Sequence, residues 1–360
     1  MMRKIVFFVF LSQIFSSYIF AQHISLHGEI SSWADFQDSA NTIGFRFIPY
    51  LNIENFNPEK TIDAEIAYDS LATWSFDKSA IDVSKTDPYR IWLRYKLPQL
   101  ELRAGLQKIN FGPCRLLRPL MWFDRTNPTD PLKITDGVYG ILARYYTLNN
   151  STAWLWTLYG NNKLKGYEAV STYTQTAEFG GRYSFHLSKG EAGITFNSRR
   201  IEDLNSDNAF ENKYALDGIW DLGIGVWFES VVIEKELTTV KPAWQKILCI
   251  GSDYTFNIGN GLHILSEHLL HANSSHFETT ENITNTSAFS LDYNLGILDN
   301  IRALYYYSWD NTKGFYHLGV TRTYDKILFY LSAYVSDIQI SNLSNLSNDK
   351  GIMLLVRYNY

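Results

Sequence analysis

The chain has 360 residues, a formal net charge of −5 and a sequence pI near 5.9, so it lacks the basic excess with which proteins bind nucleic acid. Its two cysteines are too few for a disulfide-based scaffold. Aromatic residues reach 16%, with 24 Tyr, 22 Phe and 10 Trp, a composition typical of proteins that place rings at two membrane–water interfaces.

The first residues have the pattern of a secretory signal peptide. Arg3 and Lys4 precede an apolar stretch from Ile5 to Phe20, and a small residue follows at the expected cleavage point. An uncleaved anchor is less favoured, because the stretch is short and interrupted by polar residues. We therefore expect residues 1–21 to be removed and residues 22–360 to form a single domain. Beyond residue 22 no apolar run has the length of a membrane-spanning helix.

From residue 23 onward the chain repeats one unit, about ten residues of alternating polarity followed by a polar break. In residues 90–97, for example, Ile91, Leu93, Tyr95 and Leu97 alternate with Arg90, Trp92, Arg94 and Lys96. Successive side chains of a strand point to opposite faces, so this pattern predicts strands with one apolar and one polar face.

Taken in order, these units predict about eighteen strands, within a range of 16–18. The expected strands are 23–34, 43–54, 60–73, 87–97, 99–108, 136–148, 152–161, 173–187, 190–200, 212–220, 223–234, 246–257, 260–271, 284–294, 299–309, 314–323, 326–336 and 350–360. Short breaks alternate with long ones, and the expected long ones are 74–86, 109–135, 162–172, 201–211, 235–245, 272–283 and 337–349. A soluble sandwich has no reason to separate its loops in this way. The sequence thus predicts an all-β fold, a transmembrane antiparallel β-barrel with short periplasmic turns and long extracellular loops.

The last expected strand ends on an aromatic residue, Tyr360. Terminal aromatics of this kind resemble the signal that the outer-membrane assembly machinery recognises. We therefore expect two partners, that machinery and the lipid of the outer membrane of a Gram-negative-type bacterium.

A barrel of about eighteen strands is wide enough to hold water, so its inner wall should be polar. The candidate pore-lining residues on the expected inward faces are Arg90, Arg94, Arg103, Gln107, Asp63 and Glu65. Neighbouring strands could simply pair these charges to offset their burial, or the charges could select solutes. Both alternatives stay open at the level of sequence.

The segment 109–135 combines many apolar residues with four prolines, which argues against a loop that lives in water. Such a loop can bury its apolar side chains inside the barrel, where it would narrow the passage. Packing over the outer rim is the alternative. Its charged residues would then join the pore-lining candidates: Arg115, Arg118, Asp124, Arg125 and Asp130.

Part of this region resembles a known family. The run Arg103-x-Gly105-x-Gln107-x-Ile109-x-Phe111-Gly112, followed by Asp124, Asn127-Pro128 and Asp130, is similar to a pattern shared by outer-membrane porins, above all those of the alginate-export type. The resemblance implies an eighteen-stranded wall with an arginine-rich lumen for an acidic polysaccharide, in which Arg103 and the loop arginines would take part. Capsule-assembly surface barrels are a second group of relatives that the pattern allows.

The sequence supports no catalytic site, cofactor or metal site. His263, Glu267 and His271 share one face, but residues four apart on a strand lie about 13 Å from each other, too far to hold one ion. No nucleophile elbow, phosphate loop or paired-cysteine zinc spacing occurs. Whether Cys114 and Cys249 form a bridge stays open.

These observations favour a porin-like channel for the passive diffusion of small or anionic solutes. A non-conducting surface barrel that binds capsule or another polysaccharide is the main alternative, and a barrel hydrolase is a remote one.

Overall fold

The computed structural model describes residues 24–38, 40–55, 59, 61–76, 80–202, 209–236, 243–337 and 350–360. The expected signal peptide, residues 1–21, lies outside the described residues. Among those that are described, no helix has the length and apolar character needed to cross a membrane.

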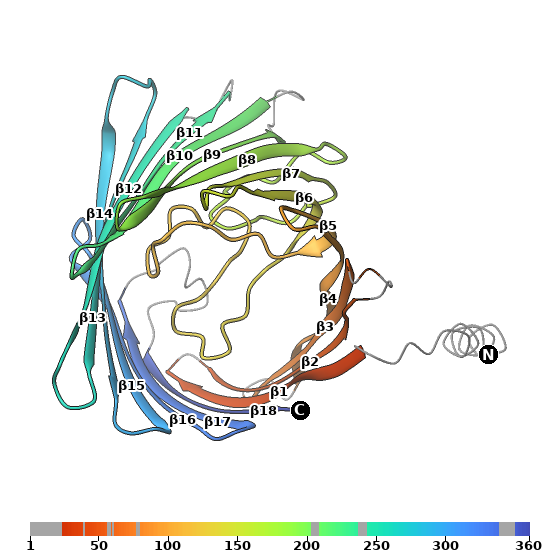
Figure 1. Ribbon diagram of the computed structural model, residues 1–360. Helices are drawn as coiled ribbons and strands as arrows, with labels where there is room; N and C mark the ends of the chain where they lie inside the picture. Colours follow the sequence, from red (N-terminus) through yellow and green to blue (C-terminus); the bar gives the residue numbers. More distant parts are fainter. Residues whose placement is uncertain are drawn as a thin grey trace, which may run out of the picture.

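The described part of the chain forms one closed sheet of eighteen antiparallel strands (Figure 1). The strands are β1 (Ile24–Gln37), β2 (Asn41–Ile53), β3 (Ile62–Ser75), β4 (Ala80–Lys96), β5 (Leu100–Gln107), β6 (Val138–Tyr146), β7 (Thr152–Leu158), β8 (Glu178–Leu187), β9 (Gly190–Ile201), β10 (Ala209–Asp221), β11 (Gly225–Lys235), β12 (Trp244–Phe256), β13 (Leu262–Ser274), β14 (Glu281–Asn294), β15 (Asp299–Ser308), β16 (Lys313–Thr323), β17 (Ile327–Ser336) and β18 (Lys350–Asn359). The predicted fold class and strand number are confirmed.

Each strand pairs with its neighbours in sequence, and β1 pairs with β18 to close the barrel. The seam reaches the last residue, since the Tyr360 backbone donates to the Gly28 carbonyl (3.1 Å) and accepts from the Gly28 amide (3.3 Å). Every described strand thus has a neighbouring strand on both sides, as a sheet that crosses lipid requires.

The two faces of the wall differ as the alternation predicts. Along β17 the side chains alternate strictly between exposed and buried. Leu93, Leu318 and Leu354 point outward and are 55%, 51% and 49% exposed, while Tyr330 points inward and is 7% exposed. The exposed apolar face therefore faces lipid, and the inward face packs against segments of the chain inside the barrel.

Several predicted long connections are wrong in their length. The expected loop 74–86 is mostly strand, because β3 continues to Ser75 and β4 begins at Ala80. The connections expected at 201–211, 235–245 and 272–283 are shortened in the same way. A strand needs only about 9–11 residues to cross the bilayer, and β4 has 17, so the β3–β4 hairpin is longer than the crossing requires. The expected loop 337–349 falls almost wholly outside the described residues.

The assignment of faces predicts the effect of a new charge on β16. Leu318→Arg would place a charge in the lipid at a cost of about 2–4 kcal/mol near the midplane, whereas Thr321→Arg, on the inward face of the same strand, would not. We expect the yield of heat-modifiable barrel in the membrane to fall strongly for Leu318→Arg and little for Thr321→Arg. Equal yields for the two variants would contradict the assignment of faces.

Candidate functional site

The segment between β5 and β6, residues 108–137, runs through the interior of the barrel (Figure 1). We call it the inward loop. Its apolar side chains pack against the wall in three clusters. In the cluster around Phe111, that ring stacks on Trp156 of β7, and Leu120 and Phe123 are 1% exposed. Burial of these side chains against the wall accounts for a loop of this length and composition inside a barrel.

Two carboxylates on the facing wall hold the backbone of the inward loop. Glu229 on β11 accepts hydrogen bonds from the amides of Cys114 and Leu120, both at 2.8 Å. Glu267 on β13 accepts three more. The three donors are the amides of Arg115 (2.6 Å), Leu116 (2.9 Å) and Leu117 (2.7 Å). Both side chains are at most 1% exposed and together accept from five loop amides, so these contacts fix the loop in the lumen.

The turn that delivers the loop to Glu229 requires a glycine. Gly112 has φ +92°, and a Cβ at this position would lie 2.4 Å from Oε1 of Glu229. A side chain there would both strain the backbone and displace the carboxylate, so this glycine positions the first anchor.

The anchors predict the behaviour of Glu267→Gln. The substitution removes the charge and one acceptor oxygen, and an unsatisfied buried donor costs about 1–3 kcal/mol. We expect the loop to leave its site intermittently, which single-channel recording would detect as current flicker. Asp253→Asn is the control, because Asp253 contacts two side chains, the half-exposed guanidinium of Arg115 (2.6 Å) and the imidazole of His263 (3.2 Å), rather than the loop backbone. A steady parental current for Glu267→Gln would show that the loop does not depend on this anchor.

The predicted charged residues of the loop occupy two environments. Arg118 and Asp124 are buried and paired at 3.3 Å, and Asp124 also accepts from Asn110. Arg115 reaches partly exposed space beside Asp253, and Arg125 donates to the Gly166 carbonyl at 3.1 Å. The first pair stabilises the loop, while Arg115 and Arg125 retain contact with water.

Three of the six predicted wall residues, Asp63, Arg94 and Arg103, are held in ion pairs. Asp63 is 1% exposed and accepts from Arg94 at 2.6 Å and from Lys96. A second group surrounds Glu101, which lies 3.0 Å from Arg103 and 3.3 Å from Arg144. Pairing of charges to offset burial is therefore realised at these positions.

Three further wall candidates are held by other partners. Glu65 accepts from the indole of Trp92 at 3.1 Å, and Arg90, 7% exposed, donates to Thr135 of the inward loop. Gln107 lies inward but is fully buried, because it donates to the carbonyls of Arg103 and Gly140 behind the loop. Its side chain is thus out of reach of lumen water, contrary to the expectation that it lines the pore.

A buried ionic network, which the sequence did not single out as a unit, joins β8, β9 and β10 to the connection 159–177. Arg182 makes a bidentate pair with Asp217 at 2.5 and 2.8 Å. Arg199, 1% exposed, pairs with Glu211 (2.7 Å) and with Glu168 of the connection (3.2 Å). The network fastens a second segment against the inner wall.

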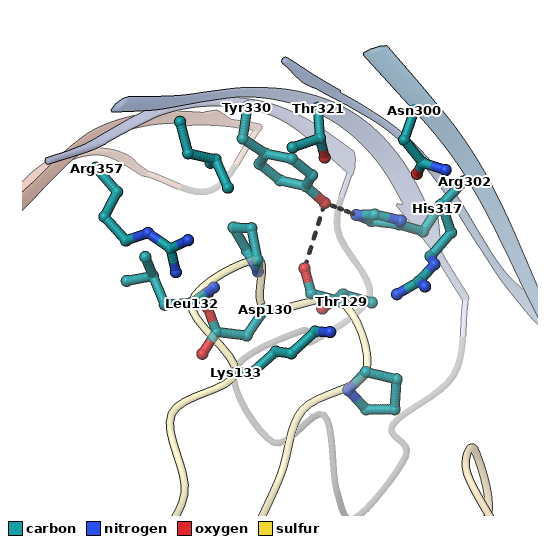
Figure 2. Close-up of a pocket in the computed structure, with 13 residues that line it drawn as sticks. Thr129, Asp130, Leu132, Lys133, Asn300, Arg302, His317, Thr321, Tyr330 and Arg357 are labelled. Atoms are coloured by element: carbon teal, nitrogen blue, oxygen red, sulfur yellow. Dashed lines mark hydrogen bonds between the residues drawn. The ribbon is translucent and has the colours of Figure 1, made fainter. Parts of the chain in front are cut away.

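Between the far end of the inward loop and strands β15 to β18 lies a cavity of about 290 Å³ (Figure 2). Arg302, Arg357 and Lys133 carry positive charge in its lining, and Asp130 is the acidic residue among the described lining residues. Burial raises the pKa of Asp130 above its ordinary value. The lining therefore carries an excess of positive charge.

The cavity is also tied to the loop by a hydrogen-bonded chain. The hydroxyl of Tyr330 donates to the Thr129 carbonyl at 3.3 Å and lies 3.0 Å from Nε2 of His317 (Figure 2). Arg302 pairs with Asp292 at 2.5 Å, but its side chain is still 42% exposed. Arg302 is thus positioned by the wall and remains accessible from the cavity.

No protein-family model matches this chain. No curated protein sequence matches it either. Solved structures do, over most of their length. OpdL of Pseudomonas aeruginosa has a TM-score of 0.61 at 10% identity, covering 94% of this chain and 98% of that one. OccAB4 of Acinetobacter baumannii has 0.58 at 8% identity, with 94% and 98% covered. An anion-selective porin from Comamonas acidovorans has 0.53 at 9% identity, with 94% and 99% covered. At such identities the likeness shows a shared outer-membrane porin fold.

Proposed function

We propose that this protein is an outer-membrane channel for the passive diffusion of small solutes, with a preference for anions. The observation that carries the proposal is the cavity between the inward loop and β15–β18, whose accessible lining holds three cationic side chains and one carboxyl. Charge of one sign in a narrow passage with low-dielectric walls raises the local concentration of the opposite ion.

The fold supports the proposal in two ways. A closed barrel of this strand number is wide enough for an aqueous passage, and its inner wall is polar. Among the similar structures, the Comamonas acidovorans protein is an anion-selective porin. The resemblance to alginate-export barrels supports the outer-membrane porin class alone. An acidic polymer is not proposed as the substrate.

Within this proposal the eleven predicted pore-lining residues divide by their exposure. Six that are not fully buried are proposed to meet solute: Glu65, Arg94, Arg103, Arg115, Arg125 and Asp130. The buried residues Asp63, Arg90, Gln107, Arg118 and Asp124 hold the wall and the loop in place. We further propose that the seam strand β18, with Tyr360, is the part that the outer-membrane assembly machinery recognises. No catalytic role is proposed for any residue.

The reversal potential in a salt gradient across a planar lipid bilayer tests the selectivity. The double variant Arg302→Gln, Arg357→Gln should lower the anion-to-cation permeability ratio severalfold, because it removes two of the three cationic groups of the cavity. The control is Lys163→Gln, which removes one charge from a side chain that is 91% exposed and outside the cavity lining. An unchanged ratio in the double variant would place the selecting charges elsewhere.

A non-conducting surface barrel is the second candidate. It is favoured by the burial of many inward charges in pairs and by two segments, the inward loop and 159–177, that occupy the space inside the wall. Absence of conductance from protein that is fully assembled in the bilayer would favour this candidate and overturn the channel.

A further inference from the structure

Two cysteines from distant parts of the chain meet where the inward loop is anchored. Cys114 belongs to the loop and Cys249 to β12, and their Sγ atoms lie within 4.8 Å of each other. Both are free thiols in this structure, 3% and 0% exposed, within one apolar cluster. They are the two cysteines of the sequence, so one intramolecular pairing exists.

The two anchoring carboxylates, Glu229 and Glu267, hold Cys114 beside Cys249. Glu229, which accepts from the Cys114 amide at 2.8 Å, lies directly opposite Cys249 in the β11–β12 ladder. The next loop amide, that of Arg115, is held by Glu267 on the other neighbour of β12. The backbone of Cys114 is therefore fixed from both sides of the strand that carries Cys249.

We propose that Cys114 and Cys249 form a disulfide in the exported protein, which ties the inward loop covalently to strand β12. An S–S bond of about 2.05 Å requires the sulfurs to approach from their present separation, which rotation of two short side chains can supply. Each thiol loses a proton, and the two electrons pass to the disulfide of an oxidising protein partner, which leaves as a dithiol. The bond would make permanent a contact that otherwise depends on hydrogen bonds.

Burial sets the order of events. It raises the pKa of the Cys114 thiol far above its ordinary value, and the thiolate is the species that reacts. Exchange therefore takes place before the loop is seated, in an oxidising compartment on the route to the membrane. This step rests on the proposed outer-membrane location. Once the loop is seated, reductants in water do not reach the bond.

A metal ion is the competing occupant, since an oxygen of Glu267 lies within 4.8 Å of both sulfurs. However, the two oxygens of Glu267 already accept from three loop amides and from the Trp227 indole (3.0 Å). Two thiolates remain, fewer than the three or four protein ligands that zinc sites use. The geometry favours a sulfur–sulfur bond.

The test uses the full-length protein in outer membranes. N-ethylmaleimide is added at the moment of lysis, and the protein is then unfolded without reductant while the reagent is still present. Intact mass should show no adduct and a chain lighter by two hydrogen atoms than the reduced form, and two adducts should appear when reduction precedes alkylation. Cys114→Ala and Cys249→Ala, made singly, should each carry one adduct. Dithiothreitol applied to the folded protein should yield no adduct when it is removed before unfolding.

Two adducts without prior reduction would overturn the disulfide, and zinc released together with them would establish the metal site instead. Adducts gained by reduction of the folded protein would overturn the seating order. Fractionation of the same cells separates this inference from the proposed location: a disulfide-bonded chain found outside the outer-membrane fraction would overturn the location and leave the bond standing.

Discussion

Removal of residues 113–131, with the ends joined by a short glycine linker, is expected to raise the single-channel conductance severalfold. The deleted segment includes the loop amides that Glu229 and Glu267 hold, and it crosses the interior of the barrel (Figure 1). An eighteen-stranded wall without it encloses a wide aqueous lumen. The anion preference should fall as well, because the deletion removes Arg115 and Arg125, two of the arginines proposed to meet solute.

The barrel should survive this deletion. The wall pairing is continuous through all eighteen described strands, and the two anchoring carboxylates would become hydrated once the loop is absent. Heat-modifiable migration of the variant checks assembly. Shortening the turn 275–280 between β13 and β14 is the control and should leave conductance unchanged. Parental conductance in an assembled deletion variant would mean that the inward loop does not limit the passage.

The strands could be predicted from sequence because each carries its own period-two signal. Leu93 faces lipid and Arg94 faces the interior, as their alternation requires, and β17 alternates strictly along its whole length. The ends of the strands could not be predicted in the same way. Ser84 and Thr86 of β4 are paired with β3 in a stretch, residues 83–86, whose side chains are all exposed, so burial requires no alternation there.

The anchors of the loop were missed for a different reason. Glu229 and Glu267 have the alternation of any inward acid, and the sequence does not say which distant amides they accept. Glu267 drew attention only beside His263 and His271, as part of a metal site that strand geometry excludes. Pairing between adjacent strands, such as Asp63 with Arg94, can be predicted from the sequence because it follows from the register of the two strands. Pairing between strands that are not adjacent, such as that of Arg182 on β8 with Asp217 on β10, cannot be predicted in this way.

The second large effect, a loss of stability, is expected from a change in the ionic network around Arg199. Arg199 is 1% exposed and touches two carboxylates, Glu211 at 2.7 Å and Glu168 at 3.2 Å. It also donates to the hydroxyl of Thr172 and to the Val170 carbonyl, both at 3.0 Å, so it joins β9 to the connection 159–177. Its removal would leave those carboxylates buried with less compensation.

Arg199→Met is therefore expected to lower the free energy of unfolding by about 3–5 kcal/mol, the cost of breaking a buried pair from one side. Denaturant titration of the refolded barrel in detergent measures it. The control is Arg322→Met, since Arg322 is 51% exposed and 3.6 Å from Asp299, a pair worth about 0–1 kcal/mol. Three lysines also face the two carboxylates: Lys165, Lys213 and Lys235. If Arg199→Met unfolds like the parent, these lysines alone neutralise the network, and the arginine is not what fastens residues 159–177 to the wall.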